Sequence, residues 1–133
     1  MKYDQLIRAY WRDVAGQNAA ALLTYFETDA QIRWHNTNEQ FTVKEFIRAN
    51  CEYPGEWRGE VERIEQSDEK VITVARVWTA DGSASFHVTS FFELRHGKIA
   101  ALDEYWGDDG PAPEWRREKR IGKPIGSRTR SPE

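Results

Sequence analysis

The stretch VITVARVWTADGSASFHVTSFFELRHGKIAALDEYW, residues 71–106, decides the fold class. β-Branched and aromatic residues are concentrated there in three runs of strand length, at 71–79, 84–95 and 98–106. The pairs Asp81-Gly82 and His96-Gly97 lie between these runs, and glycine at such positions favours tight hairpin turns. The stretch therefore predicts three consecutive antiparallel strands.

Towards the N-terminus, the pattern changes to helical periodicity. Apolar residues recur at three- and four-residue spacing over 3–14 and again over 19–26. Gly16 is a C-cap candidate for the first segment, and Asn18 is an N-cap candidate for the second. A short strand is expected over 30–35, followed by a loop.

A third helix is predicted to begin at Thr42. Thr42 and Glu45 have the spacing of a capping box, and Pro54 ends the helical pattern. A strand over 56–66 and a turn at 67–70 then lead into the meander. The element order predicts an α+β fold in which three N-terminal helices pack on an antiparallel meander sheet.

The second face of this sheet also carries apolar side chains. Both alternating sets of the run 71–79 are apolar, and only one set can face the helices. We expect the other face to be covered by a second copy of the protein, in a homodimer that buries residues such as Phe91 or Val77.

Charge and composition exclude several classes of protein. The formal net charge of −3 gives no general attraction to nucleic acid, although residues 107–133 carry 7 basic and 5 acidic side chains. No apolar stretch is long enough to span a membrane and the N-terminus is polar, so we expect a cytoplasmic protein. Three scattered histidines and one cysteine give no metal-ligand spacing, and no cofactor motif is present.

Two segments of the meander carry a family resemblance. Residues 92–99 (FELRHGKI), followed by 103–106 (DEYW), resemble the last hairpin of SnoaL-like proteins in the nuclear transport factor 2-like (NTF2-like) superfamily. There, a Phe-x-Phe/Leu-x-x-Gly-Lys-Ile run precedes an acid-aromatic-aromatic triplet. The resemblance covers roughly residues 3–108 and implies a cone-shaped domain over 1–108, with an extension over 109–133 whose last residues, 127–133, are expected to be disordered.

The resemblance places one acid in the cone. The acid of the triplet points into a deep pocket in similar enzymes, and it corresponds here to Glu104. Strand alternation agrees, because it places Glu104 on the same face as Leu102 and Trp106. Such a buried carboxyl has a raised pKa and suits acid–base catalysis. Two alternatives are pairing with Arg76, whose direction is open, and exposure to solvent.

Two histidines and one tyrosine are further candidates for the site. His35 ends the first strand and could assist catalysis at the rim, or serve only as a hydrogen-bonded structural residue. His87 could contact a ligand or lie on the outer face, and Tyr10 could offer a hydroxyl or simply pack in the core. The pairs of carboxylates around an arginine that epoxide hydrolases of this fold use are not apparent.

Three tryptophans on predicted strands, Trp34, Trp78 and Trp106, could line the cone or simply fill it. Indoles around a cavity favour a small apolar or aromatic ligand. Two classes of function therefore remain open. The first is a small-molecule enzyme, such as an isomerase, cyclase or dehydratase that uses Glu104. The second is a noncatalytic ligand-binding, protein-interaction or dimerisation domain, and nucleic-acid contact through the basic tail is a weaker alternative.

Overall fold

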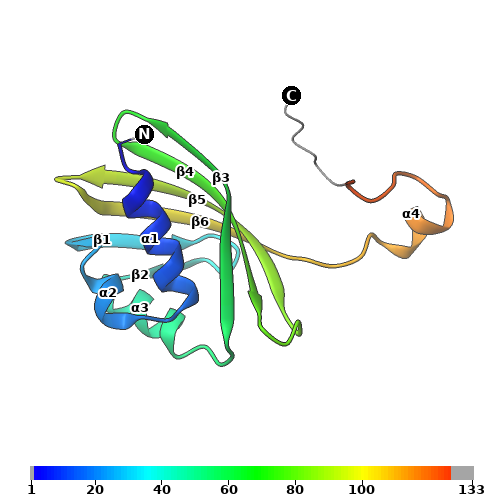
Figure 1. The fold of residues 1–133 in the computed structure, drawn as a ribbon, viewed down its shortest axis with the longest axis horizontal. Coiled ribbons are helices and arrows are strands. Elements are labelled where there is room, and N and C mark those ends of the chain that lie inside the picture. The colour runs from blue at the N-terminus through cyan, green and yellow to red at the C-terminus, as the bar shows by residue number, and fades with distance from the viewer. Residues whose placement is uncertain (1, 127–133) are drawn as a thin grey trace.

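Six strands form one curved sheet in the order β2-β1-β6-β5-β4-β3 (Figure 1). A computed structural model describes residues 2–126, so the predicted disorder of 127–133 lies outside the described residues. The strands are β1 (Phe26–Trp34), β2 (Glu39–Phe41), β3 (Trp57–Ser67), β4 (Lys70–Thr79), β5 (Ser85–Arg95) and β6 (Lys98–Asp108). Strands β3 to β6 form the predicted antiparallel meander, whereas β1 runs parallel to β6.

The last two of the three hairpin turns of the meander differ in length. His96 and Gly97 both have positive φ, 55° and 73°, as a two-residue turn with mirror-image geometry requires. The turn that contains Asp81-Gly82 is longer, because the ladder closes where Thr79 N–H donates to the Ala84 carbonyl. The sequence therefore located these two turns correctly, although the turn at Asp81-Gly82 is longer than a two-residue hairpin.

Three helices precede the meander, and Figure 1 shows them on one face of the sheet. They are α1 (Asp4–Ala15), α2 (Ala19–Leu23) and α3 (Val43–Cys51). Gly16 caps α1, and the Asn18 side chain accepts a hydrogen bond from Ala21 N–H at the start of α2. The capping box is confirmed, since Thr42 and Glu45 each accept the other's backbone N–H.

Two boundaries near β1 differ from the prediction. The second helix ends at Leu23, and Phe26 opens β1 instead of lying on the helix, because it pairs with Ile99 in β6. The segment predicted as a loop, 36–40, overlaps the short strand β2, which pairs with β1. Long-range pairing, which no local pattern encodes, decides both differences.

The space between the helices and the sheet is filled by aromatic side chains around Tyr10. Tyr10 is fully buried and packs edge-to-face against Trp11, Phe26 and Phe92. Helix α1 lies close to β3 at Gly59, where an added Cβ would come within 3.1 Å of the Ala15 Cβ. This core fills the closed end of the cone and leaves the opposite end open.

The outer face of the sheet is partly apolar. Phe91 is 43% exposed there and Tyr105 46%, and the two rings pack edge-to-face. Val77 lies on the inner face and is 5% exposed, so its expected burial in a dimer interface is wrong for this residue. The alternation along β4 places Trp78, rather than Val77, on the outer face.

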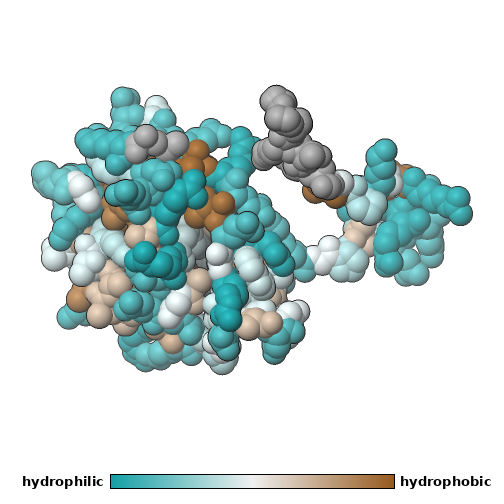
Figure 2. Space-filling model, viewed as in Figure 1, coloured by the Kyte–Doolittle hydropathy of each residue, from teal (hydrophilic) through white to brown (hydrophobic). Residues whose placement is uncertain are grey.

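The extension beyond β6 leaves the body of the domain (Figure 1). It contains the short helix α4 (Glu114–Glu118), which projects to one side and is largely hydrophilic in Figure 2. Trp115, on α4, is 56% exposed, with the Arg116 guanidinium over its ring. The Trp115 side chain is therefore not buried against the sheet of this chain.

Candidate functional site

Glu104 lies at the centre of a buried hydrogen-bond network. Its side chain is buried at 1% exposure, on the face that the alternation along β6 predicts. The register places Trp34 of β1 and Ser90 of β5 directly opposite Glu104 on either side. Trp34 Nε1–H donates to Oε1 at 3.0 Å, and Ser90 Oγ donates to Oε2 at 2.7 Å. The hydroxyl of Tyr10 lies 3.5 Å from Oε2.

This environment favours the neutral acid. Burial raises the pKa of Glu104 to about 7, while the three hydrogen bonds act in the opposite direction. The geometry suits a protonated carboxyl, because the hydroxyls of Ser90 and Tyr10 can rotate to accept a proton from Oε2. The pairing of Glu104 with Arg76 is not observed, since Arg76 bonds to Ser85 and lies near Asp109.

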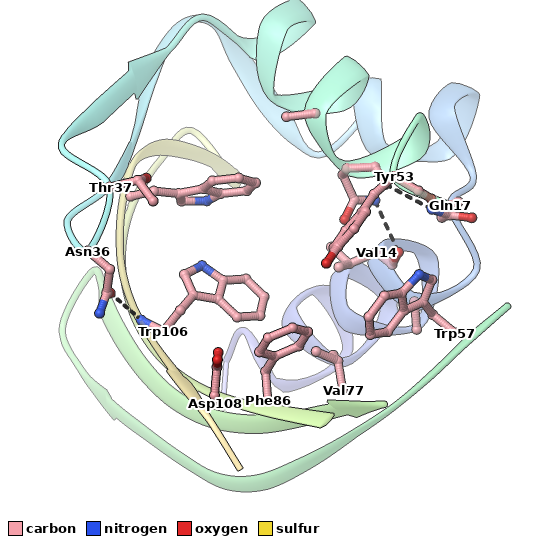
Figure 3. Close-up of a pocket in the computed structure, with 14 residues that line it drawn as sticks. Val14, Gln17, Asn36, Thr37, Tyr53, Trp57, Val77, Phe86, Trp106 and Asp108 are labelled. Atoms are coloured by element: carbon pink, nitrogen blue, oxygen red, sulfur yellow. Dashed lines mark hydrogen bonds between the residues drawn. The ribbon is translucent and has the colours of Figure 1, made fainter. Parts of the chain in front are cut away.

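An open cavity of about 490 Å³ lies beside this network, at the open end of the cone (Figure 3). Five of its lining residues are aromatic, namely Trp34, Tyr53, Trp57, Phe86 and Trp106. The others are small, aliphatic or polar, namely Val14, Ala15, Gln17, Asn36, Thr37, Ala49, Asn50, Val77 and Asp108. Glu104 is not among them. Its partner Trp34 lines the cavity instead, so Glu104 fixes a wall of the cavity from behind.

Trp106 projects into the cavity from β6, as Figure 3 shows. Its backbone N–H donates to Asn36 Oδ1 at 2.6 Å, which ties β6 to the turn after β1. Its ring packs edge-to-face with those of Trp34 and Phe86. Its buried Nε1 has no hydrogen-bond partner among the described residues. Trp34, Trp106 and Phe86 thus form a continuous aromatic wall.

Trp78 does not line the cavity, contrary to the prediction. Adjacent strand residues face opposite sides, and Val77 is the one that faces the cavity. Trp78 lies on the outer face, where the Arg76 guanidinium stacks over its ring at 4.4 Å from the centroid. The direction of Arg76, open in the sequence, is therefore outward.

The two histidine candidates also lie away from the cavity lining. His35 Nε2 lies 2.7 Å from Asp103 Oδ1, and its ring stacks on Tyr105. These contacts agree with the alternative that His35 is a hydrogen-bonded structural residue. His87 lies on the outer face between Asp109, at 2.5 Å, and Glu62, at 3.2 Å. These carboxylates raise the pKa of His87. Neither imidazole contacts Glu104, so the structure does not bring a His–Glu pair together.

Tyr10 lies within reach of Glu104 but is fully buried in the core and does not line the cavity. Sequence reasoning missed Ser90, although a small polar residue in the inward set Val88, Ser90, Phe92 was a usable signal. Phe86 was also detectable, because it belongs to the same inward-facing set of β5. Tyr53, Asn50 and Asp108 could not be found, because they come from a helix end and a strand end that only the tertiary fold brings together.

Neither a metal-binding cluster nor a membrane-spanning helix is found in residues 2–126. No group of three or more His, Cys, Asp or Glu side chains in this part could hold a metal ion. None of the helices described there is long and apolar enough to cross a membrane.

The sequence matches the model of the SnoaL-like domain family over residues 7–102. The chain belongs to this family. Solved structures that resemble this chain include a putative SnoaL-like polyketide cyclase from Shewanella putrefaciens and an epoxide hydrolase from M. tuberculosis, at 11% and 13% identity. No curated protein is significantly similar to this chain in sequence.

Solved structures support the fold of this SnoaL-like domain. A putative ketosteroid isomerase from Kribbella flavida is 19% identical, with a TM-score of 0.75 over 93% of this chain and 90% of that chain. An NTF2-like protein of unknown function from Burkholderia xenovorans is 23% identical, with a TM-score of 0.75 over 94% and 96%. A hypothetical protein with a ketosteroid isomerase-like fold from Catenulispora acidiphila, in complex with trimethylamine, is 14% identical, with a TM-score of 0.65 over 75% and 83%. At these identities, the likeness concerns the fold alone.

Proposed function

We propose that this SnoaL-like domain binds a small, flat, apolar or aromatic molecule in the cavity at the open end of its cone. The observation that carries the proposal is the aromatic wall of Trp34, Phe86 and Trp106, with Trp57 stacked on Phe86. A concave site lined by aromatic groups and a few polar ones is typical of small-molecule binding. The volume of about 490 Å³ lies within the range of ligand pockets.

The position of Glu104 supports binding more than catalysis. Its carboxyl group is surrounded by Trp34, Ser90 and Tyr10 and does not line the cavity. A catalytic acid or base must come within hydrogen-bond distance of the proton that it transfers. In this arrangement, the role of Glu104 is to hold the Trp34 indole in one orientation, which keeps the aromatic wall in place.

Acid–base catalysis by Glu104 is the second candidate function. The observation that favours it is the carboxyl pKa of about 7, because this value suits proton transfer at neutral pH. Displacement of the Trp34 ring would bring the carboxyl group to the cavity, where an isomerase, cyclase or dehydratase reaction would use it. The catalytic candidate therefore requires a movement of Trp34 that ligand binding alone does not.

Ligand titration with tryptophan fluorescence tests the proposal, because three of the six tryptophans line the cavity. tert-Butylbenzene is a suitable neutral probe, with excitation at a wavelength that the probe does not absorb. The Trp106→Ala variant should lose most of the affinity because it removes the central wall. Trp78→Ala is the matched control, since this indole lies on the outer face. Equal loss in both variants, or equal retention, would exclude the cavity as the site.

A further inference from the structure

The lining of the cavity carries a negative charge and no positive charge. Asp108 is the one charged residue among the cavity-lining residues, and no lysine, arginine or histidine lines it. Figure 3 shows the Asp108 side chain directed towards the cavity beside Trp106 and Phe86. Its carboxylate makes no ion pair with any side chain in residues 2–126. The neighbouring Asp109 differs, because it faces the outer surface and contacts Ser85 and His87.

The surroundings of the mouth add to this negative character. A second hollow adjoins the cavity and shares Ala49 and Tyr53 with it. This hollow carries Glu39, Glu45 and Glu52 against a single cation, Arg48, whose guanidinium is held by Glu52 at 2.8 Å. This adjoining hollow therefore has excess negative charge, which favours the approach of a positively charged ligand to the cavity beside it.

The aromatic wall also favours a positively charged ligand. The faces of tryptophan, tyrosine and phenylalanine rings are negative and attract a cation placed over them, most strongly where water is excluded. Five such rings line the cavity, and three of them are indoles. The Trp34 indole also donates its Nε1 proton to Glu104 behind it, and a hydrogen bond to a carboxyl oxygen increases the electron density of the ring.

We infer that the ligand of this cavity is an amine cation, namely an aromatic or compact alkyl ammonium compound whose positive group lies between the aromatic wall and Asp108. The inference rests on the proposed function, because it specifies the chemical class of ligand that the same cavity binds. It assigns two roles to the lining. The rings of Trp34, Trp57 and Trp106 surround the apolar part and the cation, and Asp108 supplies the counter-charge at the mouth.

A pair of isosteric probes isolates the contribution of charge. Phenyltrimethylammonium and tert-butylbenzene have the same shape and differ by one positive charge. Titrated by tryptophan fluorescence under identical conditions, the cation should bind the full chain about tenfold more tightly than the neutral probe. Asp108→Asn should reduce the affinity for the cation about three- to fivefold and leave the affinity for tert-butylbenzene unchanged.

Asp109→Asn provides the matched control, because this carboxylate is adjacent in sequence and lies on the outer face. It should leave the affinity for both probes unchanged. If tert-butylbenzene binds as tightly as the cation or more tightly, the inference is overturned while the proposed ligand-binding function stands. If neither probe binds, the inference and the proposed ligand-binding function are both contradicted. An equal effect of Asp108→Asn on both probes would also contradict the counter-charge role, because a shape effect would then explain the change.

Discussion

Trp34 and Glu104 are 70 residues apart in the sequence and lie directly opposite each other on the parallel strands β1 and β6, with Nε1 and Oε1 3.0 Å apart. This contact connects the buried acid to the wall of the cavity. Because the Trp34 indole both lines the cavity and donates to Glu104, changes in the charge of Glu104 should reach the cavity through the orientation of Trp34. The protonation state of Glu104 should therefore affect both the free energy of unfolding and the binding of a ligand in the cavity.

The first prediction concerns stability and pH. Burial raises the pKa of Glu104 from 4.5 to about 7, so the folded protein holds this proton more tightly than the unfolded chain. The resulting stabilisation is complete below about pH 4.5 and is lost as the pH rises through about 7. The free energy of unfolding of the wild type should fall, relative to Glu104→Gln, by on the order of 3 kcal/mol between these limits. Urea unfolding across this pH range measures it.

The control for this measurement is Glu93→Gln, which changes an exposed carboxylate on β5. It accounts for the general effect of replacing a glutamate by glutamine, so the pH dependence specific to Glu104 is the part that Glu93→Gln does not reproduce. If Glu104→Gln and the wild type follow parallel stability curves, the buried carboxyl does not change its protonation on unfolding.

The second prediction separates binding from catalysis. Glu104→Gln keeps the shape of the side chain and an acceptor for Trp34 Nε1, so the cavity wall should stay in place. In a binding protein, the affinity for tert-butylbenzene should be equal or higher, because a buried carboxylate is no longer present. In an enzyme, the same variant should abolish turnover and leave the fold intact. Fluorescence titration and a turnover assay on the same sample distinguish the two.

The third prediction concerns the start of α3. Thr42→Ala removes the acceptor of Glu45 N–H and should lower the free energy of unfolding by about 1 kcal/mol. Lys44→Ala, an exposed position in the first turn of the same helix, is the comparison and should change it little. A change below about 0.3 kcal/mol for Thr42→Ala would show that the cap contributes no net stability.

The fourth prediction concerns the outer sheet face. Exposed apolar side chains there, among them Ile72, Phe91 and Tyr105, favour a homodimer through this face. Sedimentation should give a dimer for the wild type and a monomer for Phe91→Glu. Leu23→Glu, which changes an exposed apolar residue on α2, should remain dimeric. A monomeric wild type at tens of micromolar concentration would contradict the interface.

The fold was predictable because local signals and alternation agree in this sequence. The capping box at Thr42, the turn glycines and the strand composition each specify an element without help from the rest of the chain. The prediction failed at Phe26, whose helical spacing is overridden by pairing with β6. It failed again at β2, which is three residues long and exists only because β1 offers a partner.

The site was less predictable, because alternation identifies the face of a residue but not the depth at which it lies. It placed Glu104 and Trp106 correctly on the inner face, but it could not show that Trp34 stands between the acid and the cavity. Trp78 illustrates another difficulty. Both alternating sets of side chains along β4 are apolar, so the sequence does not show which set faces the cavity. Asp108 is exposed at a strand end, where sequence patterns give no direction.

The parallel pairing of β1 with β6 also determines the order of events during synthesis. β1 emerges from the ribosome early, yet the strand on which it aligns is the last of the sheet and follows it by about 70 residues. Before β6 is available, only the three-residue β2 can pair with β1, so one long edge of β1 stays open until β6 has been synthesised. Nascent chains that stall before residue 98 should therefore be the species most dependent on chaperones.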